Sequence, residues 1–71
     1  MKNPSPTRQE IMEVAERVLT RKQYDVFRLW SNDVGAARIA IMLGISEPVA
    51  RRTVKRAVQL VEIELRKEET A

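Results

Sequence analysis

Residues 36–55 read AARIAIMLGISEPVARRTVK, which is the pattern of two short helices joined by a tight turn. Gly44 stands where the first helix must end, and glycine readily adopts the left-handed backbone conformation that such a turn requires. Ser46 suits the cap of the next helix, and Pro48 falls in its first turn, where no backbone donor is needed. Ala40 is a small residue that lets the two helices cross closely. The segment therefore predicts a helix-turn-helix.

Apolar residues occupy the positions of both helices where the two would cross. These residues are Ile39, Leu43, Ile45 and Ala50. Beyond the turn, apolar residues continue at helical spacing, which predicts a long last helix over about residues 47–67. Its predicted buried stripe consists of Ala50, Val54, Ala57, Val61 and Leu65.

A first helix is predicted near the N-terminus. Ser5 can accept hydrogen bonds from the first free amides of a helix, and Pro6 suits the first helical position. Apolar residues then recur at helical spacing as far as Val18. This helix is expected over about residues 6–18, with residues 1–5 as a loose lead-in.

A second helix is predicted over about residues 20–31, because Thr20 and Gln23 have the spacing of a capping box. Its expected buried stripe consists of Val26, Phe27 and Trp30, with Leu29 on the edge. The spacing of these aromatic residues favours a core role over a stacking platform for single-stranded nucleic acid.

A polar turn at residues 31–33 then leads to a short third helix over about 35–43, which Gly35 opens. The expected fold class is all-α. Residues 1–71 would form one four-helix helix-turn-helix domain with a long C-terminal recognition helix.

Composition narrows the possible functions. The 71 residues are 44% hydrophobic and 32% charged, which is typical of a folded domain with one small core. The chain has no Cys and no His, so disulfides, thiol or imidazole catalysis and the usual zinc and iron ligands are excluded. Glu10, Glu13 and Glu16 line a helix surface without an implied cleft. We therefore expect no enzymatic activity and no cofactor.

The expected location is the cytoplasm, in association with the nucleoid. No apolar run approaches the length of a membrane span, and the N-terminus lacks the apolar stretch of a signal peptide. No membrane partner is therefore expected.

Positive charge is concentrated in one segment of a chain whose net charge is +3. Residues 46–58 contain Arg51, Arg52, Lys55 and Arg56 against Glu47 alone. On the predicted last helix, these cations lie opposite or beside the buried stripe. A cationic outer face on the second helix of a helix-turn-helix is what docking in the major groove of double-stranded DNA requires.

Residues 19–65 resemble region 4 of bacterial sigma factors, which reads an upstream promoter element. The matching stretches are Leu19-Thr20-Arg21-Lys22-Gln23, Ile39-Ala40, Leu43-Gly44-Ile45-Ser46, Arg51 and Arg56-Ala57. Response-regulator output domains have similar signatures. The resemblance implies contacts to base edges from Glu47, Pro48, Arg51 and Arg52. The chain departs from the family at Gly35, where Ser or Thr is usual, and at Pro48, whose ring cannot donate a hydrogen bond.

The sequence thus predicts a small stand-alone, sequence-specific DNA-binding regulator of transcription from a bacterium or bacteriophage. Pro48, Arg51, Arg52 and Lys55 would face base edges, while Arg38 and Arg56 would hold phosphates. The alternative for Arg38 is an ordinary surface residue.

Other interpretations remain open at this point. The resemblance also implies a module that binds RNA polymerase and modulates transcription. Small viral DNA-packaging recognition subunits share the Leu-Thr-x-Lys-Gln start and a helix-turn-helix. A plain helical bundle with a solvated charged face is the simplest alternative. Leu60 and Ile63 lie off the buried stripe and are candidates for a homodimer or partner contact.

Overall fold

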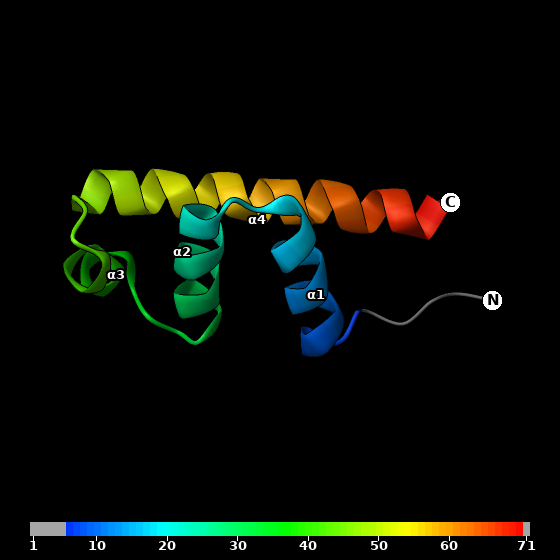
Figure 1. Ribbon diagram of the computed structural model, residues 1–71, viewed down its shortest axis with the longest axis horizontal. Coiled ribbons are helices and arrows are strands. Elements are labelled where there is room, and N and C mark those ends of the chain that lie inside the picture. Colours follow the sequence, from blue (N-terminus) through cyan, green and yellow to red (C-terminus); the bar gives the residue numbers. More distant parts are fainter. Residues whose placement is uncertain (1–5, 71) are drawn as a thin grey trace.

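The computed structural model describes residues 6–70, which form four α-helices. These are α1 (Arg8–Val18), α2 (Arg21–Ser31), α3 (Ala36–Leu43) and α4 (Glu47–Thr70). With 24 residues, α4 is about 36 Å long at 1.5 Å per residue. The other three helices all pack against it, as Figure 1 shows. The predicted all-α fold with a long C-terminal helix is confirmed.

Each of the helices α1 and α2 begins with a capping box. At the start of α2, the Gln23 amide donates to Thr20 Oγ1 at 3.2 Å, and Gln23 Oε1 accepts from the Thr20 amide at 3.0 Å. This box is as predicted. At α1 the same reciprocal bonds join Thr7 and Glu10, at 3.1 and 2.8 Å.

The predicted start of α1 at Pro6 was wrong, because the helix begins at Arg8 behind the Thr7 cap. Thr7 has a glutamate three residues later that completes the box, whereas the third residue after Ser5 is the cation Arg8, which cannot accept a hydrogen bond. Ser5 itself and the lead-in predicted over residues 1–5 lie outside the described residues.

The core consists of two clusters of buried side chains, and α2 and α4 contribute to both. One cluster lies between α1, α2 and the middle of α4; its buried members are Val14, Ala15, Leu19, Phe27, Ala57 and Val61. The other lies between α2, α3 and the earlier half of α4; its buried members are Val26, Leu29, Ile39, Ala40, Ala50 and Val54. The buried stripe predicted for the last helix is confirmed at Ala50, Val54, Ala57 and Val61, whereas Leu65 is only partly buried.

Trp30 was predicted to be buried and Leu29 to lie at the edge of the buried stripe, and the structure reverses the two. Trp30 is 46% exposed, whereas Leu29 is only 8% exposed. The reason is that α2 lies between two clusters and buries two stripes, with Phe27 in one and Leu29 in the other. Trp30 stands in the last turn of α2, at the end remote from α4 (Figure 1).

The turn between α3 and α4 has the predicted chemistry. Gly44 ends α3 in the left-handed conformation, with φ 69° and ψ 35°. The Ile45 amide donates to the Ala40 carbonyl at 3.0 Å, which closes the end of the helix. The Val49 amide then donates to Ser46 Oγ at 3.3 Å, so Ser46 caps α4. This tight turn fixes how α4 leaves α3.

The far end of α4 extends past the predicted end at residue 67 to Thr70. An ion pair between Arg17 of α1 and Glu68 joins the two helices in this added turn. Within residues 6–70, no helix combines the length and the apolar character needed to span a lipid bilayer.

Candidate nucleic-acid interface

The outer side of the first half of α4 is cationic and exposed to solvent. We call it the α4 cationic face, and its members are Arg51, Arg52, Lys55 and Arg56, all of which are exposed. On the opposite side of the helix, Ala50, Val54 and Ala57 are buried. Because this buried side fixes the rotation of α4 about its axis, the cations must point outward.

Within this face, Arg51 has a partner on its own helix. Its Nε lies 3.1 Å and its Nη2 lies 2.5 Å from Oε2 of Glu47, one turn earlier. The structure thus brings together two of the residues predicted to contact bases. By contrast, Arg52, Lys55 and Arg56 have no side-chain hydrogen bond or ion pair with any other residue in the described part of the chain.

The remaining predicted contact residues lie near the start of this face. Pro48 is exposed in the first turn of α4. Arg38 is exposed on α3, and its side chain has no hydrogen bond or ion pair among residues 6–70. Through Ile39 and Ala40, α3 packs against the buried side of the first half of α4.

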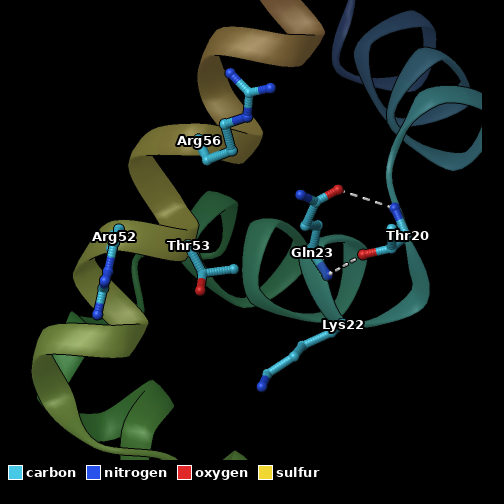
Figure 2. Close-up of a pocket in the computed structure, with 6 residues that line it drawn as sticks. All are labelled: Thr20, Lys22, Gln23, Arg52, Thr53 and Arg56. Carbon is cyan, nitrogen blue, oxygen red and sulfur yellow. Dashed lines mark hydrogen bonds between the residues drawn. The ribbon is translucent and has the colours of Figure 1, made fainter.

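A cavity of about 320 Å³ opens between the start of α2 and the middle of α4 (Figure 2). We call it the α2–α4 cavity. Its lining residues are Thr20, Lys22, Gln23, Arg52, Thr53 and Arg56. Three of these side chains are cations and none is a carboxylate, so the cavity is suited to an anion.

Sequence reasoning assigned Thr20 and Gln23 only a capping role, and it gave no contact role to Lys22 or Thr53. The sequence does contain one indication of a site at the start of α2. Arg21 and Lys22 stand in the first turn of α2, which has no acidic residue. The dipole of a helix disfavours cations at its N-terminus, so two cations in this turn indicate a role other than stabilising the helix.

The two candidate partner contacts, Leu60 and Ile63, differ from each other in burial. Leu60 is partly buried and packs against the cluster between α1 and α4, so it belongs to the core of its own chain. Ile63 is 49% exposed. The most exposed large apolar residues are instead Ile41 and Met42 on α3, at 82% and 56%. Sequence reasoning considered only the inner side of that helix and missed them.

The carboxylate side chains of the described residues do not form a metal-binding cluster. No three His, Cys, Asp or Glu side chains gather in this part of the chain in a way that could hold a metal ion.

No family model matches the chain, and no curated protein and no solved structure matches it. Its function is therefore inferred from the geometry and chemistry of its own residues.

Proposed function

We propose that this protein binds double-stranded DNA without catalysing a reaction, and that it regulates transcription by placing the first half of α4 in the major groove. The observation that carries the proposal is the α4 cationic face, exposed on the helix that follows the Gly44 turn. A helix with its side chains is about 10–12 Å wide, which suits a major groove about 12 Å wide.

The side chains of this face have donors that suit both bases and phosphates. Arg51 can donate two parallel hydrogen bonds to guanine once it leaves Glu47, and Pro48 can touch a thymine methyl group. Lys55 points outward beside them. Arg56 and Arg38 are both exposed, and in this proposal they neutralise phosphates.

The arrangement also favours a fixed docking geometry over loose charge attraction. Ala50 and Ile39 are fully buried where α4 and α3 pack together, and Gly44 and Ser46 close the turn between the two helices. A face held by packing presents its cations in one orientation, which sequence-specific recognition requires. The role in transcription rests on the resemblance to sigma factor region 4.

The test is a fluorescence-anisotropy titration of a random pool of labelled duplexes, at low and at near-physiological salt. We expect the wild type to bind with an affinity that falls steeply as salt rises, because phosphate contacts release counterions. The Arg51→Ala/Arg52→Ala variant should lose this binding. The duplexes retained by the wild type can then be sequenced to find the preferred site.

A matched control is Arg17→Ala/Arg28→Ala, which removes the same charge from exposed positions on α1 and α2. This variant should bind nearly as well as the wild type. No binding by the wild type at low salt would overturn the proposal. Equal losses in the two double variants would mean that net charge alone, and not the α4 cationic face, attracts the DNA.

A second candidate function is favoured by the exposed apolar side chains of α3. Ile41 and Met42 face solvent on the helix beside the DNA-facing one, and exposed apolar groups of this kind occur at protein interaction sites. In this alternative the chain binds RNA polymerase, as the resemblance implies. Binding to purified polymerase without DNA, lost in Ile41→Ser/Met42→Ser and kept in Arg51→Ala/Arg52→Ala, would support it over the first.

A further inference from the structure

We propose that the α2–α4 cavity binds a phosphate group of the DNA backbone, so that α2 and α4 together grip the strand that borders the major groove. The DNA source of that phosphate rests on the proposed function. The capacity of the cavity to bind phosphate follows from its own lining residues.

The first argument is charge. Lys22 from α2 and Arg52 and Arg56 from α4 line one opening, and no carboxylate shares it. None of the three cations has an ion pair with another residue in the described part of the chain. Like charges around one opening repel each other, and an anion bound among them would remove that repulsion. Ammonium and guanidinium groups are also the donors that phosphate oxygens accept best.

The second argument is a neutral donor with a fixed direction. Gln23 Oε1 accepts the hydrogen bond from the Thr20 amide, so the capping box decides which end of the side-chain amide faces α2. The side-chain nitrogen of Gln23, Nε2, therefore points to the side of α4, as Figure 2 shows. This Nε2 atom has no hydrogen-bond partner among residues 6–70. A phosphate oxygen in the cavity would accept from it.

The third argument is the shape of the site. Figure 2 shows Lys22 reaching from α2 toward α4, with Thr53 facing Gln23 between the two helices. Arg52 and Arg56 lie one turn apart and point in different directions, so both must swing inward to close on a ligand. At about 30 Å³ per water molecule, the cavity of about 320 Å³ has room for a phosphate and some of its hydration.

The position of the cavity links it to base reading. Arg52 borders the cavity and also belongs to the α4 cationic face, next to Arg51. A phosphate held there would lie against the same helix that enters the groove, and phosphate contacts of this kind set the register of a protein on the duplex. Because Arg52 belongs to both surfaces, it is left unchanged in the test.

The cavity is tested directly by NMR, with inorganic phosphate as the probe and chloride at equal ionic strength as the reference. We expect phosphate-specific shifts at the backbone amides of Lys22 and Gln23 and at the Gln23 side-chain amide. These shifts should be lost in Lys22→Gln/Arg56→Gln and kept in Arg28→Gln, which removes a cation from the other end of α2. Absent shifts, or shifts unchanged in the double variant, would overturn the phosphate site.

The DNA source is tested by the salt dependence of duplex binding. The plot of log K against log salt has a negative slope, and losing one phosphate contact makes that slope less steep by about 0.9. We expect this reduction in Lys22→Gln and the wild-type slope in Arg28→Gln. If the wild type binds DNA and Lys22→Gln keeps the full slope, the assignment to the DNA backbone is wrong while the proposed function stands.

If the wild type binds no DNA, both the proposed function and the DNA source fail. Phosphate-specific shifts in the NMR titration would then assign the cavity to a free phosphate group, and their absence would overturn the site altogether.

Discussion

Arg51 is hydrogen-bonded to Glu47 through two nitrogens, with Nε at 3.1 Å and Nη2 at 2.5 Å from the same carboxylate oxygen. The two residues are four apart on α4, with the acidic residue nearer the N-terminus, which is the favourable orientation in the field of the helix dipole. The pair therefore holds Arg51 along the helix surface in the free protein. A base that takes two parallel hydrogen bonds from the Nε and Nη2 edge of Arg51 must displace Glu47, whereas Nη1 remains open.

Replacing Glu47 with Gln should strengthen binding to random-sequence duplexes severalfold at low salt. The change keeps the shape of the side chain, frees Arg51 and removes a carboxylate that repels phosphates. The gain should shrink as salt rises, because exposed charges are screened. Fluorescence anisotropy measures both effects.

Glu62→Gln is the matched control, because it removes the same charge from an exposed position further along α4. A similar gain in both variants would show that only net charge changed. Unchanged binding in Glu47→Gln would show that the pair does not restrain Arg51.

Ile39→Ala should lower the free energy of unfolding by about 2–5 kcal/mol, because it removes a fully buried side chain where α3 packs against α4. Ile41→Ala, on the same helix but 82% exposed, should change it by no more than about 0.5 kcal/mol. Urea denaturation followed by circular dichroism measures both. Similar losses in the two variants would mean that α3 is rotated about its axis relative to this structure.

Gly44→Ala should lower the free energy of unfolding by about 1–2 kcal/mol, because an L-residue with a side chain is strained at a φ of 69°. Steric contact adds nothing, since a Cβ at Gly44 meets no atom within 4 Å. Gly44→Asn should cost less, because Asn tolerates the left-handed region better. Equal losses for Ala and Asn in the same denaturation assay would contradict this account of the turn.

Gly35→Ser should raise the free energy of unfolding by about 0.5–1 kcal/mol, by adding a cap and restricting the unfolded chain. Gly35 occupies the cap of α3 without a side-chain hydrogen bond, at φ −71° and ψ 161°, a conformation open to any residue. A Cβ there meets no atom within 4 Å. Thermal unfolding should show a higher Tm for Gly35→Ser than for Gly35→Ala, which lacks the hydroxyl; the reverse order would rule out capping.

Local features of this fold were predictable from the chain alone. The Thr20 capping box, the left-handed Gly44 and the Ser46 cap each depend on residues within a few positions of one another. The buried stripe of α4 follows from a helical period that is the same in every protein. Such features are read correctly because neighbouring residues and backbone geometry determine them.

Features that depend on which helix covers which face were not predictable in this way. Periodicity places Phe27 and Trp30 on one side of α2, but only the packed structure shows that Phe27 is buried while Trp30 is 46% exposed. The same holds for Leu60, which is partly buried against the cluster that contains Val14, Phe27 and Val61. Lys22 and Arg56 meet at one cavity because the α1–α2 hairpin packs across the middle of α4. Contacts between segments far apart in the chain arise from the joint burial of several apolar faces, and no single segment encodes that arrangement.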